Sequence, residues 1–407
     1  MSVPTSVATD DRATTLAPSS PFPPYPKTAH QAEFMALADR LADEAAARAM
    51  AHDRAGTFPH DTFRLLQDAG YLALTVPERY GGRGATPLEL MLAQERLARG
   101  DGAVALAAAM HLQIVGGLAE SGAWPEPLFA RLCREIVEDG ALINSAGSEP
   151  ELGSPSRGGP YATVAVPTAD GWRISGRKTW TTLSPALRYA IVLLSVEEPD
   201  GSLGRGSVLV PIPTPGLRIE ETWDSLSMRA SGSHDLVFDG VVVPRENRLP
   251  APSGPPGRDP RGWSLITSAV YLGVAVAARD FAVRYARERV PSGVGAPVAE
   301  IESVQHRIAQ IEILLLQARS VLYGTAEAFE QVGDERDAIA WRAAAAKYTA
   351  TNHAIQITDQ ALRVVGSTGL SRAHPLERYF RDVRAGVGNP PLDDVALTVI
   401  GRAALGL

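Results

Sequence analysis

The sequence has little of what holds small secreted proteins or membrane proteins in place. A single cysteine, Cys133, among 407 residues excludes an internal disulfide and a cysteine-based metal site. No run approaches about 18 uninterrupted apolar residues, the length that a membrane-spanning helix needs. The N-terminus also lacks a basic segment followed by an apolar one, so no signal peptide is predicted. These absences lead us to expect a soluble, cytoplasmic protein without a membrane span.

Positive charge is scarce as well. Lysine and arginine number 39 against 46 aspartates and glutamates, which gives a formal net charge of −7 at pH 7. Such a balance disfavours nucleic acid as a partner, although a few local arginines could still hold the phosphates of a small ligand. The motifs H-E-x-x-H and G-x-S-x-G, which mark metal sites and serine nucleophiles, are also absent. We therefore expect neither a metal site nor a serine nucleophile.

The residues that are present divide the chain into four segments. Residues 1–28 are rich in Ser, Thr, Pro and Ala, and are predicted to form a disordered tail. Residues 29–140 carry apolar side chains three or four positions apart, which is typical of helices. Residues 141–252 change to short β-rich runs separated by turns, which predicts a small β-barrel or sandwich. Residues 253–407 return to a helical pattern whose lengths suit an antiparallel four-helix bundle.

The predicted fold class is therefore α+β, mostly α, in the order helical, β, helical. This order excludes a doubly wound sheet or a (β/α)8 barrel, and no G-x-G-x-x-G follows a first strand. The strands expected in the central segment are Ala162–Val166, Trp172–Ser175, Tyr189–Val196, Ser207–Ile212, Leu217–Thr222 and Asp235–Val243.

Five short motifs lie along the chain in a fixed order. They are Leu72–Gly84 (LALTVPERYGGRG), Gly147–Ser154 (GSEPELGS), Gly171–Thr182 (GWRISGRKTWTT), Met228–Pro244 and Ala361–Asp394. Together they resemble the acyl-CoA dehydrogenase family, in the right order and over most of the chain. The resemblance implies an N-terminal helical domain, a central β-barrel domain, a C-terminal four-helix bundle, an FAD cofactor, and a homotetramer or homodimer.

The resemblance also implies which residues of the central segment bind the flavin. Ser148 and Ser154 occupy flavin-contact positions in one loop, where hydroxyls and amides can bond the ring carbonyls and the pyrophosphate. Trp180 matches the aromatic residue that stacks on the flavin, and Thr182 matches the hydroxyl beside N5. The alternatives are a turn that is merely rich in serine and glycine, and a tryptophan of the core.

Three further cofactor residues are expected in the C-terminal segment. Arg289 resembles the arginine that reaches the FAD pyrophosphate of a neighbouring subunit, because its planar fork suits paired phosphate oxygens. Gly366 and Ser367 stand where the family often has two glycines, and the retained glycine still permits a close approach of the backbone to a phosphate.

The catalytic base is where this sequence departs from the family. Acyl-CoA dehydrogenation needs a carboxylate that removes the α-proton while hydride passes to the flavin. Pro390 stands at the position of that glutamate and cannot accept a proton. Asp393 and Asp394 follow a few residues later and could act as the base if the loop shifts. The alternative is that they cap or solvate the last helix.

Flavin-dependent monooxygenases of the same fold also lack that glutamate, and some carry a histidine near the position of Asn389. His111 is then the best candidate for a proton donor near the flavin, the alternative being a core histidine with satisfied hydrogen bonds. In this setting Asn389 is the second candidate catalytic residue.

Three functions remain open from the sequence. The leading hypothesis is α,β-dehydrogenation of an acyl-CoA or acyl-carrier thioester with FAD, with an electron-transfer flavoprotein as partner. The second is a two-component monooxygenase that uses FAD or FMN on a hydrophobic or aromatic substrate, with a flavin reductase as partner. The third is a catalytically silent flavin-binding homologue.

Overall fold

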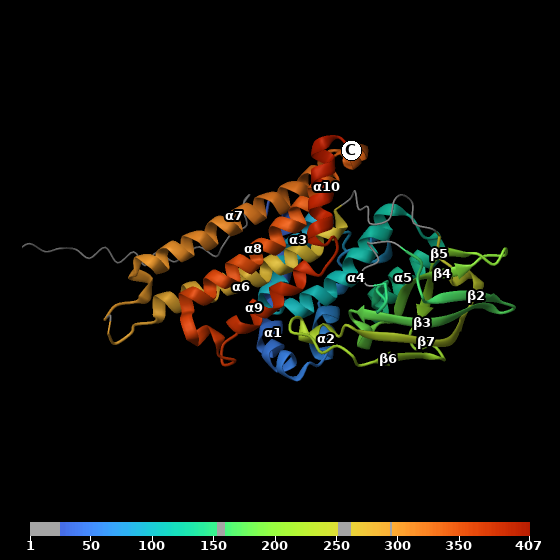
Figure 1. The fold of residues 1–407 in the computed structure, drawn as a ribbon, viewed down its shortest axis with the longest axis horizontal. Coiled ribbons are helices and arrows are strands. Elements are labelled where there is room, and N and C mark those ends of the chain that lie inside the picture. The colour runs from blue at the N-terminus through green and yellow to red at the C-terminus, as the bar shows by residue number, and fades with distance from the viewer. Residues whose placement is uncertain (1–24, 153–158, 251–261, 294) are drawn as a thin grey trace, which may run out of the picture.

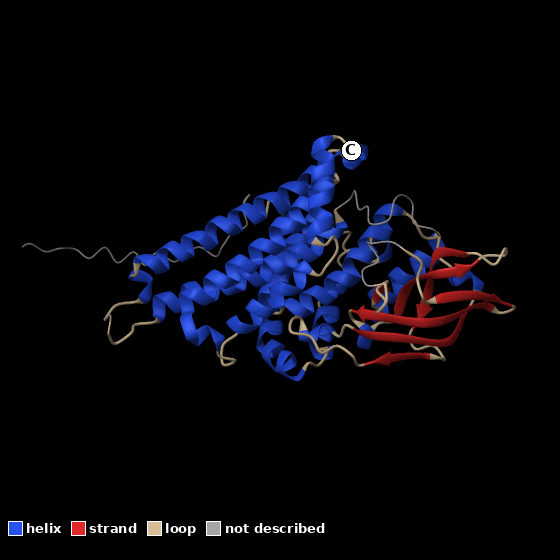
Figure 2. Ribbon diagram, viewed as in Figure 1, coloured by secondary structure: helices blue, strands red, loops and turns tan. Residues whose placement is uncertain are grey.

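A computed structural model describes residues 25–152, 159–250, 262–293 and 295–407 of the chain. The protein is mostly helical, with one β-sheet at one end (Figure 1 and Figure 2). Helices from the beginning and from the end of the sequence pack together into one elongated body, and the sheet lies at the side of this body (Figure 1). The order helical, β, helical is as predicted, and it reproduces the expected fold class.

The N-terminal part folds into five helices among the described residues. Capping residues set their boundaries: the Thr86 hydroxyl accepts from the Glu89 amide while the Glu89 carboxylate accepts from the Thr86 amide. Asp101 caps the next helix by accepting from the amides of Ala103 and Val104. The helices are α1 (Ala29–Ala55), α2 (His60–Asp68), α3 (Pro87–Gly100), α4 (Gly102–Ser121) and α5 (Glu126–Asp139).

Two helical segments, Gly102–Ser121 and Trp263–Glu288, are long and apolar enough to span a membrane by length and composition alone. Their most apolar windows are 67% and 83% buried inside the protein. Both segments therefore behave as core helices of the body.

The central segment forms a single curled sheet of seven strands in the described residues (Figure 2). The order is β1-β4-β2-β3-β7-β6, with β5 paired to β4, and side chains such as Ile174, Val192 and Phe238 fill its core. Six strands correspond to the predicted runs, whereas β1 was not predicted. The strands are β1 (Ile143–Ala146), β2 (Val164–Thr168), β3 (Gly171–Thr181), β4 (Tyr189–Glu197), β5 (Leu203–Pro211), β6 (Leu217–Glu220) and β7 (His234–Val243).

The C-terminal part consists of long helices that pack against one another and against α3. Gly273 permits the close contact with α3, because a side chain there would meet the Glu95 carbonyl oxygen at 2.2 Å. Glu95 also forms a buried ion pair with Arg319. The helices are α6 (Ile266–Glu288), α7 (Glu302–Gln331), α8 (Trp341–Val365), α9 (Leu376–Asp382) and α10 (Asp393–Leu405).

The Arg381-Asp382 pair of the last motif joins three parts of the chain. Arg381 forms an ion pair with Asp53 of α1 at 2.7 Å, and Asp382 accepts a hydrogen bond of 2.7 Å from the Met228 amide. Asp382 is fully buried, and this burial raises its pKa to about 7. The motif therefore fastens the bundle to the N-terminal helices and to the loop before β7.

The described part of the chain begins at Tyr25, before residue 29, where the first helical segment was predicted to start. Tyr25 is buried, its ring packs edge-on against Tyr323 of α7, and its hydroxyl donates to Glu327. Burying an aromatic ring offsets the cost of ordering the short segment that precedes α1. The rest of the predicted tail, residues 1–24, lies outside the described residues.

Candidate active site

His111 of α4 connects this N-terminal helix to the sheet and to the segment that follows α2. Its Nδ1 accepts a hydrogen bond of 3.2 Å from the Ile143 amide of β1, and its Nε2 lies 3.0 Å from the Leu72 carbonyl oxygen. The side chain is fully buried, and burial lowers its pKa to about 4. Because both ring nitrogens are engaged by the backbone, these contacts match the alternative of a core histidine rather than a proton donor.

Beside His111 on α4, the face formed by Met110, Gln113 and Ile114 lines a cavity of about 410 Å³. Trp263 also lines the cavity, and its indole donates a hydrogen bond of 2.6 Å to Glu120 of α4. The remaining lining residues are Ser264, Thr267, Asn389 and Pro390. The cavity has the size of a small-molecule site and a mainly apolar lining with a few polar groups.

The wall made by Trp263 depends on Gly116. A side chain at Gly116 would lie 2.2 Å from the Trp263 ring, whereas one at Gly117 would lie 3.9 Å from it. The indole therefore rests directly on the backbone of α4 at Gly116. This contact fixes where the indole stands beside α4.

Asn389 enters the cavity from the segment before α10. Its Nδ2 donates a hydrogen bond of 2.6 Å to the hydroxyl of Tyr271, a fully buried residue of α6. Burial raises the Tyr271 pKa well above its ordinary value, so the phenol stays neutral. Among the described residues that line the cavity, none carries a carboxylate.

Asp393 and Asp394 occupy the first turn of α10. Asp393 pairs with the Lys347 ammonium at 3.3 Å and accepts a hydrogen bond of 3.0 Å from the Asn352 amide. Asp394 accepts from the Val395 amide, and neither aspartate lines the cavity. These contacts match the alternative in which both residues serve the last helix.

The residues around Trp180 fit a flavin. A register shift between Lys178 and Thr181 turns the strand, Trp180 takes a backbone φ of 56°, and its indole is 61% exposed. Next to it the Thr181 hydroxyl is buried without a hydrogen-bond partner in the described part of the chain. An exposed aromatic face beside hydroxyl groups suits a flat ring with a polar edge.

The loop that carries Ser148 is held beside this strand. The Ser148 carbonyl accepts a hydrogen bond of 3.0 Å from the Thr179 amide, so Ser148 lies next to Trp180. Lys178 pins the loop through an ion pair of 2.7 Å with Glu149, and both side chains are buried. Burial lowers the Lys178 pKa to about 8. Ser154, in contrast, lies outside the described residues.

Thr182 continues the polar edge into a chain of hydroxyl groups. Its Oγ1 lies 2.9 Å from the Ser233 hydroxyl, which lies 2.7 Å from the Ser231 hydroxyl. The Thr182 carbonyl accepts from the Asn144 amide of β1 at 2.8 Å. The structure thus brings Ser148, Trp180 and Thr182 together at one edge of the sheet.

Arg289, Gly366 and Ser367 lie elsewhere. Arg289 follows α6 and Gly366 follows α8, and the hydroxyls of Tyr285 and Thr368 join these two ends at 3.4 Å. This end of the bundle points away from the sheet (Figure 1). The three residues are exposed, so they are free to meet a ligand held by another subunit.

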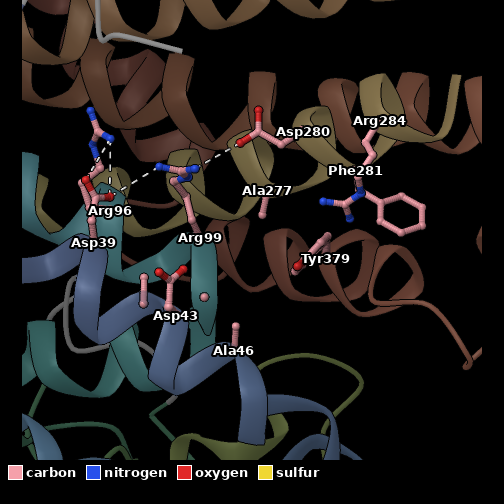
Figure 3. Close-up of a pocket in the computed structure, with 12 residues that line it drawn as sticks. Asp39, Asp43, Ala46, Arg96, Arg99, Ala277, Asp280, Phe281, Arg284 and Tyr379 are labelled. Atoms are coloured by element: carbon pink, nitrogen blue, oxygen red, sulfur yellow. Dashed lines mark hydrogen bonds and ion pairs between the residues drawn. The ribbon is translucent and has the colours of Figure 1, made fainter. Parts of the chain in front are cut away.

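A second groove, of about 450 Å³, lies between α1, α3, α6 and α9 (Figure 3). Its charged side chains contact one another: Asp39 contacts Arg96 at 3.3 Å and Arg99 at 3.5 Å. Arg99 also contacts Asp280 of α6 at 3.3 Å. None of the predicted site residues lines this groove, so we interpret it as an ion-pair network that connects three helices.

Comparison with known protein families now tests the resemblance. Three family models match the chain: the acyl-CoA dehydrogenase N-terminal domain over residues 28–123, the middle domain over residues 144–241 and the C-terminal domain over residues 265–388. The chain belongs to the acyl-CoA dehydrogenase family. The resemblance to this family that the sequence motifs indicated is thus confirmed.

Individual members of the family differ in chemistry. YdbM of Bacillus subtilis, which bears a provisional acyl-CoA dehydrogenase name, is 42% identical over 92% of this chain and 97% of its own. The amino sugar nitrososynthase DnmZ of Streptomyces peucetius is 33% identical over 89% of this chain and 90% of its own. Members with two kinds of reaction are therefore similar to this chain over nearly its whole length.

Solved structures of the family give the same result. KijD3 in complex with FMN and a dTDP-linked amino keto sugar matches with a TM-score of 0.82 at 29% identity, over 94% of this chain and 95% of that one. Butyryl-CoA dehydrogenase from Megasphaera elsdenii matches with the same TM-score at 26% identity, over 94% and 99%. The fold of this chain is thus the acyl-CoA dehydrogenase fold.

The sequence did not point to Gln113 and Trp263, which line the cavity, or to Tyr271, which bonds the lining residue Asn389. Gln113 gave a usable signal, because Met110, Gln113 and Ile114 share one helix face and an amide on an apolar face is conspicuous. Tyr271 gave none, because its partner Asn389 lies 118 positions away in the sequence.

Proposed function

We propose that this acyl-CoA dehydrogenase family member is a flavin-dependent monooxygenase that acts on a small, mainly apolar substrate. One observation carries the proposal: Asn389 and Pro390 face the cavity where the family's base would stand, and no described lining residue is a carboxylate. An amide and a proline can position a ligand but cannot remove an α-proton. The similarity to the nitrososynthase DnmZ supports the same direction.

The flavin supplies the redox chemistry when bound, since a reduced flavin can pass two electrons to oxygen so that one oxygen atom enters the substrate and the other leaves as water. FMN is present in the matching KijD3 structure, and FAD or FMN fits the prediction for this chain. Trp180 would hold the ring, while Ser148 and Thr182 would bond its polar edge. The apolar walls of the cavity would exclude water from the substrate.

The second candidate is α,β-dehydrogenation of an acyl-CoA or acyl-carrier thioester. The 42% identity with YdbM and the matches to short-chain acyl-CoA dehydrogenases favour it. Asp393 would then have to leave Lys347 and enter the cavity to act as base, and Asp394 would be the other choice.

Two measurements separate the candidates. In an anaerobic titration of the flavin-loaded protein with a panel of acyl-CoAs, a monooxygenase should leave the oxidised flavin absorbance unchanged. With chemically reduced flavin, air and isotopically labelled oxygen, label should appear in a product of an apolar substrate. Bleaching by any acyl-CoA, combined with no label incorporation, would overturn the proposal in favour of dehydrogenation. A protein that does neither would be the silent homologue.

Partners and surroundings follow from the proposed reaction. A flavin reductase would supply reduced flavin to a monooxygenase, and an electron-transfer flavoprotein would replace it for a dehydrogenase. Exposed apolar side chains of α7 and of the C-terminal end, among them Ile313, Leu316 and Leu397, support assembly into a homotetramer or homodimer. We place this assembly in the cytoplasm.

A further inference from the structure

The Trp263 indole is held at two points. Its ring rests on α4, where a side chain at Gly116 would lie 2.2 Å from the ring. Its N–H donates a hydrogen bond of 2.6 Å to Glu120, near the end of the same helix α4. An indole has only this one donor, so the buried ring cannot turn without giving up its hydrogen bond.

The Glu120 carboxylate is in turn held by Arg336. Its Oε1 forms an ion pair with the Arg336 guanidinium, while its Oε2 accepts the hydrogen bond from the Trp263 indole. The two charged side chains are only 28% and 23% exposed. Charge-assisted hydrogen bonds are the stronger ones, and a carboxylate that uses one oxygen for each partner is fixed in its orientation.

Arg336 connects this arrangement to the end of α7. It lies in the short segment that joins α7 to α8, and its Nε donates a hydrogen bond of 2.6 Å to the Phe329 carbonyl oxygen. The Phe329 ring also packs beside the residue before Trp263, because a side chain at Gly262 would lie 3.1 Å from it. The last turn of α7 is therefore linked to the Trp263 segment both directly and through Arg336 and Glu120.

We infer that Glu120 and Arg336 are positioning residues that set the size of the cavity by holding the Trp263 indole in place. Neither belongs to the described lining, whereas Trp263 does. The inference rests on the proposed monooxygenase function, for which it names the residues that decide how large a substrate the site accepts. A fixed indole penalises a ligand that is too large, and an indole that can turn relieves this overpacking.

A spectroscopic label on the indole tests whether it is held in this way. Biosynthetic 5-fluorotryptophan labels the six tryptophans, and Trp263→Phe identifies the Trp263 signal in the fluorine NMR spectrum. Glu120→Ala should shift and broaden this signal, because the ring loses its acceptor and exchanges between orientations. Arg336→Leu should shift it in the same direction by a smaller amount. The double variant should match Glu120→Ala alone, since Arg336 acts through Glu120.

Binding of two probes to the flavin-loaded protein, without reductant, tests the effect on the cavity. Quinoline and acridine differ by one fused ring and are both uncharged in mildly alkaline buffer. Calorimetry gives their dissociation constants, and Glu120→Ala should raise the affinity for acridine relative to quinoline by about fivefold.

Arg342→Leu is the matched control. Arg342 is exposed at the start of α8, and its guanidinium lies 5.8 Å from the centre of the Trp341 ring. This variant should move the Trp341 signal and leave both the Trp263 signal and the ratio of the two affinities unchanged.

Three outcomes would overturn the inference: an unchanged Trp263 signal in Glu120→Ala, a further shift when Arg336→Leu is added to Glu120→Ala, or an unchanged ratio of affinities in Glu120→Ala. A lower melting temperature with the same signal and the same ratio would mean that the two residues are only structural. Because no turnover is involved, failure of the monooxygenase proposal is recognised separately. A changed ratio in a protein that incorporates no oxygen would overturn the proposed reaction and leave the positioning role standing.

Discussion

At the scale of single residues, His111 shows how burial can assign a role. Its ring joins α4 to β1 and to the Leu72 carbonyl oxygen while remaining neutral. The same residue type in a solvated cleft would be a natural proton donor. The environment of a histidine, rather than the side chain itself, thus decides whether the residue has a structural or a catalytic role.

Because burial lowers the pKa of His111, the stability of the protein should depend on pH in a defined range. The pKa of His111 is about 4 in the folded protein against an ordinary value of 6.5, so the unfolded chain binds the extra proton between these values. The free energy of unfolding should therefore fall as the pH is lowered from about 6.5 to about 4, by up to about 3 kcal/mol from this residue.

The variant His111→Gln should flatten this part of the curve, because glutamine retains a donor and an acceptor but does not titrate. Urea unfolding of both proteins at about pH 5 and about pH 7 measures the difference. His234 and His353, whose pKa values are also lowered by burial, are present in both proteins and cancel. Parallel curves for variant and wild type would show that other groups carry the acid sensitivity.

At the scale of elements, charge pairs connect the helices with very different strengths. The Glu95–Arg319 pair joins α3 to α7 with side chains only 2% and 5% exposed, and the Tyr323 hydroxyl also donates to Glu95. The pairs of Arg99 in the groove of Figure 3 are longer, and its side chain is 31% exposed. Burial makes the first pair costly to break, whereas water screens the second.

Arg319→Leu should therefore lower the free energy of unfolding by about 3–5 kcal/mol, because it leaves the Glu95 carboxylate buried without its partner. Arg99→Leu is the matched control and should cost at most about 1 kcal/mol. Chemical denaturation of the two variants beside wild type provides the comparison. Equal losses of unfolding free energy in both variants would contradict the conclusion that the buried Glu95–Arg319 ion pair holds α3 against α7.

The sequence was sufficient for the elements that repeat a simple pattern. Helical patterns were located in residues 29–140 and 253–407, and β-rich runs between turns located six of the seven strands in the described residues. β1 escaped because its four residues, INSA, show no alternation, and because it pairs in parallel with β4, 46 positions away. Long-range pairing of this kind leaves no local trace.

The same limit applies to the site. Motif matches predicted Ser148, Trp180 and Thr182 as flavin contacts, and the hydrogen bond from the Thr179 amide to the Ser148 carbonyl brings the loop beside the strand. The exposure of Trp180 follows from a register shift between β3 and β7, which no local sequence pattern predicts. The ion pair of Asp393 with Lys347 spans 46 positions, and the Asn389–Tyr271 hydrogen bond spans 118. Such contacts are decided by packing rather than by the local pattern.

At the scale of the whole molecule, the predicted cofactor residues form two separate groups. Trp180 lies at the sheet, and Arg289 lies at the far end of the bundle (Figure 1). If both groups bind one flavin, they come from different subunits, as the prediction for Arg289 requires. Flavin affinity should then depend on assembly as well as on either residue alone.

Mixing two defective proteins tests this arrangement. Trp180→Ala and Arg289→Ala should each weaken flavin binding by about tenfold or more when pure, since each removes a stacking or phosphate contact. After denaturation and joint refolding, mixed dimers should regain one intact site in two, measured by flavin fluorescence in equilibrium dialysis. No recovery in the mixture, with recovery in a refolded wild-type control, would contradict a flavin site shared between subunits.

The contact between the Trp263 ring and Gly116 has a consequence for how the cavity can change over evolution. Because the Trp263 ring fills the space of a side chain at position 116, these two positions share one volume. A smaller residue at position 263 would enlarge the cavity. A larger residue at position 116 would then fill part of the space that the Trp263 ring had occupied. A lineage could thus move between bulky and compact substrates through two paired substitutions, while the bundle, the sheet and the amide of Asn389 stay as they are.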